Sequence, residues 1–421
     1  TATDGSGKSA TCKVTVTDGT TPSQPGGSTG GSSGGSSSGG GGGSSSTTPT
    51  KPETVTKPDG TKVETVTKPD GTTVKTETKK DGSVTKTETK TETKPDGTKV
   101  ETKNETVTNK DGSKVETRSE VKTDKNGVTS GTETTKTTTA NGSTGMTVTT
   151  IENGESKTAA EAKVSDKAIE DAKKNGEAVK APVEVEASRD SNIAPTVKVE
   201  LPKGASETKV EIPVSNATPG TVAVLVHPDG TEEIVKDSIP TEGGIRLTVN
   251  DGATVKIVDN SKDFADTRNH WAKDAIDFVS ARGLVNGMND SIYAPNNSTT
   301  RAQLWTILAR QNDADLTGGN TWFENAQNWA KEKGISDGAN PNAAINRAQM
   351  VTMLWRAMGQ PAAGGTANFT DVPADSYYAS AVSWAVENGI TIGVGGGRFD
   401  PTSACTRAQI AAFLARLYTE K

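Results

Sequence analysis

Aromatic residues are missing from the first 263 positions of this 421-residue chain. Its six Phe, four Tyr and six Trp all lie between Phe264 and Tyr418. Aromatic side chains bury the largest areas in protein cores. We therefore expect a well-packed core mainly after residue 263. Before it, any fold must be built from Val, Ile, Leu and Thr.

Cysteine, long apolar runs and concentrated charge are also scarce. Cys12 and Cys405 have no His or Cys nearby at metal-site spacing, so we expect small buried residues rather than ligands. No run of 18 apolar residues occurs, so no membrane-spanning helix is predicted. The formal net charge is −6 without a long basic block, which disfavours nucleic acid as a partner. Because the chain starts with Thr1, inside what reads as a domain, we expect a C-terminal fragment or a processed product.

Residues 1–18 are predicted to form a turn and a strand. Turn residues stand at positions 4–7, and apolar and polar residues alternate from Ala10 to Thr17. The phrase Gly7-Lys-Ser-Ala-Thr-Cys-Lys-Val-Thr-Val16 resembles the end of a bacterial immunoglobulin-like domain. Residues 19–50 are rich in Gly and Ser and are predicted to be a flexible linker with an r.m.s. span of roughly 30 Å.

Residues 51–154 form a repeat array in which Asp-Gly or Asn-Gly recurs at spacings of 11 to 15 residues. Such dipeptides between Thr- and Val-containing runs predict β-hairpins. Each repeat has only one or two Val, and burying one Val contributes about 1.5–3 kcal/mol. Ordering costs about 1–2 kcal/mol per residue. We therefore expect a thin extended β-ribbon or a partly disordered stalk, with its Lys and Glu forming a solvated polar face.

Residues 155–260 are predicted to form a small β-rich domain with one short helix. Ser165 is the expected N-cap of that helix and Gly176 its end. Seven strands are predicted to follow, at 183–187, 197–201, 208–214, 222–226, 233–235, 245–249 and 254–258. His227 lies beside a turn and is expected at the surface, because a metal site needs several converging ligands.

The C-terminal part contains one short phrase three times. It reads Thr300-Arg301-Ala302-Gln303, Asn346-Arg347-Ala348-Gln349 and Thr406-Arg407-Ala408-Gln409. Nine residues after each arginine stands a second one, at Arg310, Arg356 and Arg416. The anchor glycines Gly283, Gly334 and Gly389 precede the three phrases by 17, 12 and 17 residues, so the middle copy has a loop five residues shorter.

Each copy is predicted to be a helix, a loop and a second helix. The first helix, 272–282 in the first copy, should end at its anchor glycine, where a left-handed residue is needed. Thr or Asn should cap the second helix, with Gln at its third position. Three apolar stripes should then pack together: Leu304, Ile307 and Leu308; Met350, Met353 and Leu354; and Ile410, Phe413 and Leu414.

Residues from about 263 to 421 resemble three tandem S-layer homology domains, at 263–312, 320–359 and 368–418. The resemblance is carried by Phe264-Ala-Asp266 with His270-Trp271-Ala272, Phe369-Thr-Asp371-Val372-Pro373, Trp384-Ala-Val-Glu-Asn-Gly-Ile390, Phe399-Asp-Pro401 and the three Arg-Ala-Gln phrases. The resemblance implies a three-fold bundle. Its inter-repeat grooves would bind pyruvylated secondary cell-wall polysaccharide and attach the protein non-covalently to a Gram-positive-type wall.

The resemblance also implies the ligand contacts. Arg301, Arg347 and Arg407 would contact the pyruvate carboxylate, and Gly287, Gly338 and Gly393 would let the backbone approach the sugar. The chemistry agrees, because unpaired N–H groups at a helix start favour an anion and arginine offers a planar fork. The alternative, that these arginines pair with a local acid or close the bundle, stays open.

Several other residues are expected to serve the fold. Arg310, Arg356 and Arg416 suit the negative ends of their helices. Trp271, Trp322 and Tyr377 are expected in the core, His270 at a helix start, and Asp266 and Asp371 in turns or caps. The middle copy lacks the Phe-x-Asp opening, so its groove is expected to be degenerate, with Arg347 the weakest candidate.

The chain is thus predicted to be multidomain: a Gly/Ser linker, a hairpin-type repeat array, a small β-rich domain and an α-helical pseudo-threefold bundle. No catalytic constellation, metal or cofactor is predicted. The expected function is anchoring an extracellular protein to the cell wall or surface layer of a Gram-positive-type bacterium. The alternatives are a structural subunit of a self-associating surface layer, and the anchoring tail of a polysaccharide-degrading enzyme whose catalytic domain lies upstream.

Overall fold

The computed structural model describes residues 2–3, 9–10 and 52–419. The predicted linker, Cys12 and most of the immunoglobulin-like stretch lie outside these residues. Within that stretch, β1 (Ala2–Thr3) and β2 (Ser9–Ala10) pair antiparallel. The chain divides into two compact units, Thr1–Gly131 and Thr132–Lys421.

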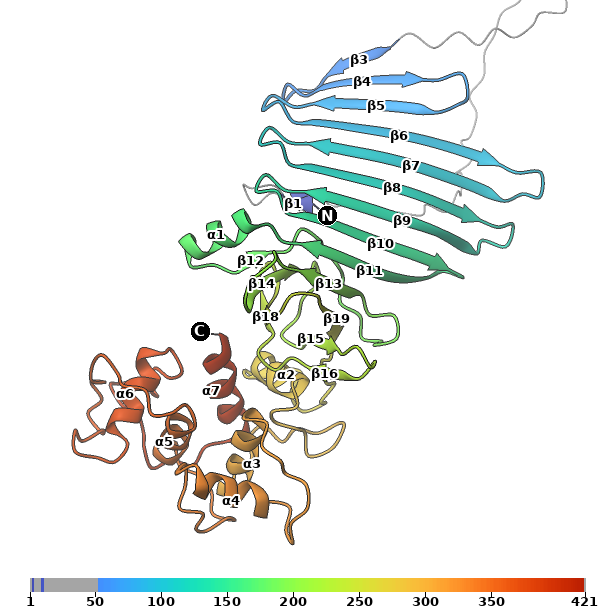
Figure 1. The fold of residues 1–421 in the computed structure, drawn as a ribbon. Helices are drawn as coiled ribbons and strands as arrows, with labels where there is room; N and C mark the ends of the chain where they lie inside the picture. The colour runs from blue at the N-terminus through green and yellow to red at the C-terminus, as the bar shows by residue number, and fades with distance from the viewer. Residues whose placement is uncertain (1, 4–8, 11–51, 420–421) are drawn as a thin grey trace, which may run out of the picture. The chain divides into compact units, whose positions relative to one another are not determined.

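The first unit contains an antiparallel meander in which each strand pairs with the next (Figure 1). Its strands are β3 (Glu53–Thr56), β4 (Lys62–Thr67), β5 (Thr73–Thr78), β6 (Val84–Thr93), β7 (Lys99–Thr108) and β8 (Lys114–Thr123). Only Thr61, Val63, Ser83 and Ser119 are buried among the described residues of this unit. The sheet therefore has no apolar core, as the scarcity of Val predicted.

The hairpin turns of the array are confirmed. In all eight Asp-Gly or Asn-Gly dipeptides the glycine has φ between 82° and 90°, where a side chain would be strained. In the first turn, the backbone N–H of Lys57 donates to the Thr61 carbonyl and that of Gly60 to the Lys57 carbonyl. The Asp59 carboxylate accepts from the Thr61 N–H at 2.8 Å, so the acid is part of the turn.

Lysine and glutamate form many ion pairs on the meander. Glu77 lies 2.9 Å from Lys57 and 3.0 Å from Lys75, and Glu88 lies 3.0 Å from Lys86. The lysines are about half exposed. Exposed pairs contribute little to stability. The backbone ladder and the turns therefore define these strands more than the charges do.

The second unit begins with a β-rich segment, whose strands belong to two sheets and which contains one helix. β9 (Thr129–Thr138) runs into this unit. β10 (Thr144–Glu152) pairs antiparallel with β11 (Glu155–Lys163), and β11 pairs parallel with β13 (Thr196–Glu200). The order continues through β19 (Ala253–Asp259) and β15 (Thr221–Val226) to β16 (Glu232–Ile234). A smaller sheet has the order β12 (Val179–Lys180), β14 (Thr208–Pro213), β18 (Gly244–Val249), β17 (Ile239–Thr241).

Most predicted elements of this β-rich segment are present. Helix α1 (Asp166–Asn175) has Ser165 as its N-cap and Gly176 at φ 70° after its last residue, as predicted. The predicted strand at 183–187 is wrong, because only Val185 makes a bridge there, to Val214. The Asn216 side chain bonds both backbone groups of Ala187, where a neighbouring strand would otherwise pair. An aromatic-free core of Val, Ile, Leu and Ala packs beneath these elements.

Three helix pairs follow, one for each copy of the triplicated phrase (Figure 1). The first helices are α2 (Lys273–Ala281), α4 (Glu324–Glu332) and α6 (Ala379–Glu387). The second helices are α3 (Arg301–Gln311), α5 (Arg347–Ala357) and α7 (Arg407–Thr419). The anchor glycines after the first helices have φ of 66° to 67°, which confirms the predicted left-handed stops.

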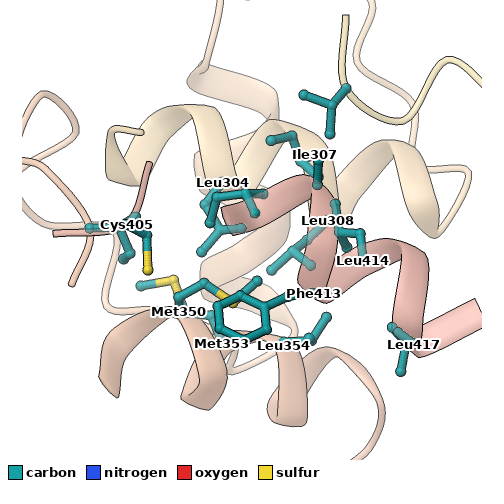
Figure 2. Close-up of a cluster of buried hydrophobic side chains, with 14 of the residues drawn as sticks. Leu304, Ile307, Leu308, Met350, Met353, Leu354, Cys405, Phe413, Leu414 and Leu417 are labelled. Atoms are coloured by element: carbon teal, nitrogen blue, oxygen red, sulfur yellow. The ribbon is translucent and has the colours of Figure 1, made fainter. Parts of the chain in front are cut away.

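The predicted apolar stripes of α3, α5 and α7 meet in one core. Figure 2 shows Leu304 and Leu308 of α3 near Met350 and Leu354 of α5 and Phe413 of α7. Cys405 lies in the same cluster, is buried and carries a free thiol, as expected. The aromatics five residues before the anchor glycines join this core, with Phe278 and Trp384 buried.

Candidate functional site

A closed ring of backbone hydrogen bonds joins the three copies of the phrase. The N–H of Thr299 donates to the Cys405 carbonyl at 2.9 Å. The N–H of Cys405 donates to Ile345, and the N–H of Ile345 donates back to Thr299, both at 2.8 Å. The three residues that precede the caps are therefore held around a common centre, and each second helix starts from it.

All three second helices begin with the predicted capping box. Thr300 and Asn346 accept from the backbone N–H of the Gln three residues on, whose side chain accepts from the cap N–H in return. Thr406 and Gln409 make the same two bonds at 3.0 Å and 3.3 Å. Thr, Asn and Gln thus serve the helix starts.

The backbone N–H groups at these helix starts are already bonded. The N–H of Arg301 donates to Ala343 and that of Ala302 to Pro341, in the loop of the next copy. Arg347 and Ala348 donate to Ser403 and Pro401 in the same way. The prediction that unpaired N–H groups receive an anion here is therefore wrong, since the loop before the next phrase occupies them. The backbone at these helix starts therefore has no free N–H to offer, and side chains must supply the donors.

Each of the three arginines reaches into the loop of another copy. Nε of Arg301 donates to the Ala339 carbonyl at 2.8 Å, Nε of Arg347 to Phe399 at 2.7 Å and Nε of Arg407 to Tyr293 at 2.8 Å. The three residues are buried, with at most 8% of their surface exposed. One N–H of each guanidinium thus closes the bundle, which is the structural alternative left open by the sequence.

The remaining donors of the three arginines differ. Arg301 donates to the Ser336 hydroxyl at 3.0 Å and pairs with the Asp337 carboxylate. Arg407 donates to the Asn286 carbonyl at 2.7 Å. Nη2 of Arg347 is buried without a hydrogen-bond partner among the described residues. Burial lowers the pKa of Arg347 and of Arg407 below the ordinary value.

The three predicted glycines lie in the loops that these arginines contact. A Cβ on Gly287 would come within 2.4 Å of the Phe264 ring, and one on Gly393 within 2.6 Å of the Phe369 ring. A Cβ on Gly338 would meet the Lys331 side chain at 2.6 Å. Close packing therefore favours glycine at 287 and 393, whereas at 338 a side chain would meet a flexible lysine and would strain a backbone with φ of 71°.

Two acids hold the loops of the first and third copies. The Asp266 carboxylate accepts from the N–H groups of Tyr293 and Ala294 at 3.0 and 2.7 Å. Asp371 accepts from Phe399 and Asp400, both at 2.8 Å. Both acids stand in turns, as expected, but their carboxylates bond a loop 27 to 29 residues further on instead of capping those turns. Partial burial pushes the pKa of Asp371 up, but these two N–H groups outweigh it and the pKa lies below its usual value.

One cavity of about 280 Å³ lies at the loop of the first copy. We call it the Gly287 groove. Gly287, Gln303 and Ile307 line it together with Arg310, Trp322 and Arg407, so all three copies contribute to it. None of its lining residues is acidic.

The aromatics twelve residues before the anchor glycines are not in the core, contrary to prediction. Trp271, Trp322 and Tyr377 are 67%, 64% and 61% exposed. They stand just before the first helices, and other side chains of those helices, such as Phe278 and Trp384, occupy the core. Trp322 lines the Gly287 groove, and Tyr377 lies near enough to Arg301 and Arg356 that both charges act on its hydroxyl. Recurrence could not distinguish them from the aromatics five residues before the anchor glycines, which recur as regularly and lie in the core.

The other candidate groups have structural roles. Nδ1 of His270 accepts from the Ala272 N–H at 3.2 Å at the start of α2, as expected. His227 lies 3.3 Å from Glu233 on a partly exposed hairpin. In the part of the chain that the structure describes, no cluster of His, Cys, Asp or Glu could hold a metal ion. No helix of that part is long and apolar enough to cross a membrane.

The family model of the S-layer homology domain matches residues 263–304 and 368–411, the first and third copies. These two segments are S-layer homology domains. The second copy lies between the matched segments and has the short loop. The three copies of the phrase, each with its helix pair, are called repeats 1, 2 and 3 below.

Known relatives include surface proteins and enzymes. An amylopullulanase of Thermoanaerobacterium thermosulfurigenes is 28% identical over 50% of this chain and 12% of its own length. An S-layer protein of Bacillus thuringiensis subsp. finitimus is 25% identical over 39% of this chain and 22% of its own length. A cellulosome-anchoring protein of Acetivibrio thermocellus is 31% identical over 27% of this chain and 29% of its own length. The matched part therefore spans less than a third of each relative.

Proposed function

We propose that this chain anchors an extracellular protein non-covalently to a bacterial cell wall through its S-layer homology repeats. The observation that carries the proposal is the Gly287 groove, where a loop of repeat 1, Arg407 of repeat 3 and Trp322 of repeat 2 meet. The ring of backbone bonds through Thr299, Ile345 and Cys405 supports a pseudo-threefold bundle. The names of the relatives, an S-layer protein and a cellulosome-anchoring protein among them, point to the same use.

The proposed ligand is secondary cell-wall polysaccharide that carries pyruvyl ketals. A groove lined by Arg310 and Arg407 without an acid favours an anion. An exposed Trp at its edge offers an apolar face for a sugar ring. Arg301, Arg347 and Arg407 would act as carboxylate contacts with Gly287, Gly338 and Gly393 beside them, Arg407 being the best placed. The protein would then lie outside the cell, in the wall or surface layer of a Gram-positive-type bacterium.

A sedimentation assay of the whole chain with purified cell walls tests the proposal. We expect binding to native walls and loss of most binding after mild acid has removed the pyruvyl ketals. No binding to native walls would refute anchoring. Unchanged binding after acid treatment would refute the pyruvyl ligand alone.

Substitutions at Arg301, Arg347 and Arg407 are poor probes of binding, because all three side chains are buried and bond backbone carbonyls. Trp322→Ala is the better variant, since that side chain is 64% exposed. Trp271→Ala, at the equivalent place in repeat 1, is the matched control for a defect confined to the Gly287 groove.

A second candidate is a structural role in a self-assembling surface layer, favoured by the match to an S-layer protein. The repeat array of residues 51–154 would then be a stalk between lattice and neighbouring domains. Electron microscopy of the purified chain distinguishes the two, because a lattice subunit forms two-dimensional arrays and a tether does not. The third candidate, the tail of an enzyme, places catalysis in a part outside these 421 residues.

A further inference from the structure

Arg310 differs from the two arginines at the same position in the other repeats. Arg356 donates from Nη1 to the Ile335 carbonyl at 3.3 Å, and Arg416 donates from Nη1 to Ile390 at 3.1 Å. Both acceptors stand one residue after the anchor glycine of the same repeat. The Arg310 guanidinium makes no such bond to Leu284, and it has no hydrogen-bond or ion-pair partner among the described residues.

The unpartnered guanidinium lies in the wall of the Gly287 groove. Arg310 is half-buried, and this burial alone lowers its pKa below the usual value. Arg407 lines the same groove, and two of its five N–H donors are used by Tyr293 and Asn286. A half-buried guanidinium has lost part of its hydration, and an anion bound in the groove would give it a charged partner. The groove therefore offers free donors from two cations and no acid to neutralise them.

The backbone at Arg310 is held in place from outside the repeat. Nζ of Lys236 donates to the Arg310 carbonyl at 2.6 Å and pairs with the Asp313 carboxylate. These contacts join the loop after β16 to the end of α3. The Arg310 backbone is thus fixed while its guanidinium is left unbonded. Such preorganisation lowers the cost of ordering the site on binding.

The groove of Arg301 does not have this character. Arg356, which stands there in the place of Arg310, is bound to a carbonyl, and the Asp337 carboxylate pairs with Arg301. At that junction, the charge of Arg301 is therefore neutralised by Asp337, and Arg356 already bonds a carbonyl. The difference between the two grooves comes from particular side chains, which the recurring motif does not predict.

We propose that the Gly287 groove is a two-arginine site, in which Arg310 binds a second anionic group of the wall polymer beside the one that meets Arg407. This rests on the proposed anchoring function and distinguishes the Gly287 groove from the junction at Arg301 as an anion site. The second group is a carboxylate or a phosphate, since the guanidinium fork suits either. With about 280 Å³, the groove accommodates a small charged unit of the polymer rather than a long segment.

Isothermal titration of the whole chain with purified wall polymer tests this, using Arg310→Gln and its matched control Arg416→Gln. We expect Arg310→Gln to lose about tenfold or more in affinity, the effect of one charge-assisted contact, and to bind with weaker salt dependence. Arg416→Gln should stay within about twofold. Arg310→Lys should recover part of the affinity, because it keeps the charge without the fork. Thermal melting should show all three variants folded.

Treated polymers identify the second anion. Mild acid cleaves pyruvyl ketals, and hydrofluoric acid cleaves phosphodiesters. If one treated polymer binds wild type and Arg310→Gln with equal affinity, that treatment has removed the group that Arg310 contacts. If wild type binds native polymer and Arg310→Gln matches it within twofold, the two-arginine site is refuted while anchoring stands. If wild type binds no wall polymer, the anchoring function fails and this inference fails with it.

Discussion

The guanidinium of Arg282 donates two hydrogen bonds to the backbone carbonyl of Ser238, from Nε at 3.1 Å and from Nη2 at 2.5 Å. It also donates to the carbonyls of Pro219 and Thr221. Arg282 ends the first helix of repeat 1, whereas its partners belong to the β-rich segment. The side chain is 1% exposed and stacks on Phe278 at 3.7 Å. Repeat 1 and the β-rich segment are therefore packed as one body at this point.

Arg282→Met should destabilise the second unit strongly. The substitution keeps apolar bulk but leaves the Ser238 and Thr221 carbonyls without these donors inside the protein. Each unsatisfied buried group costs about 1–3 kcal/mol, so we expect about 3 kcal/mol in all. Urea unfolding followed by tryptophan fluorescence measures this, since every Trp lies in repeats 1 to 3. The control is Arg268→Met at an exposed site, which should stay within about 0.5 kcal/mol. Equal stabilities of the two variants would contradict the role of Arg282.

Local sequence rules predicted much of this architecture. Ser165 and Gly176 bound α1, the Gln of each phrase completes a capping box, and each anchor glycine ends its helix, because caps and turns depend on neighbouring residues. The apolar stripes of α3, α5 and α7 also met as predicted, since period and volume decide which faces are buried.

Contacts between distant segments could not be predicted in this way. Arg282, Lys333 and Asn388 each stand directly before an anchor glycine. Nothing in the neighbouring sequence indicates that Arg282 bonds Ser238 in the β-rich segment. The exposure of Trp322 depends on which other side chains fill the core. The Arg310 guanidinium is unbonded because it does not make the hydrogen bond to a backbone carbonyl that Arg356 and Arg416 make. Such differences arise from tertiary packing, which differs between the repeats although the sequence motif is the same.

Gly287→Ala should weaken binding to wall polymer. The added Cβ would meet the Phe264 ring at 2.4 Å and the Asn289 carbonyl at 2.5 Å, so the loop that lines the groove must shift. We expect a loss of at least about tenfold in affinity together with about 1–3 kcal/mol in stability, as for overpacking in a core. Gly365→Ala is the matched control, because its Cβ would meet nothing within 4 Å and its φ is not positive. A shared loss of binding in both variants would show that the Gly287 effect is not specific to the groove.

Asp371→Asn should lower stability at neutral pH and lose its effect in acid. The carboxylate accepts two backbone N–H bonds, whereas an amide can offer only one oxygen and brings its NH₂ against the other donor. The pKa of Asp371 is lowered in the folded state, so its contribution is complete above the unfolded pKa of about 4 and is lost as pH falls through the lower folded value. We expect a deficit of about 1–3 kcal/mol at pH 7 that shrinks below about pH 4. Urea unfolding at several pH values measures it, and a deficit that does not change with pH would exclude the linkage.

Cys405 should report opening of the helical bundle. Its carbonyl and N–H belong to the ring that joins the three helix starts, and its side chain is fully buried. Burial raises the pKa of this thiol to about 12, so at pH 8 its thiolate fraction is about a thousandfold below that of an ordinary cysteine. In a Cys12→Ser background, we expect iodoacetamide to label Cys405 within minutes in urea and only over many hours in native buffer. Mass spectrometry of the peptide containing Cys405 follows the reaction. Arg282→Met should accelerate native labelling if bundle and β-rich segment open together, whereas Arg268→Met should not. Fast labelling of the folded wild type would show that the ring opens readily and that the helix starts are not held as the structure has them.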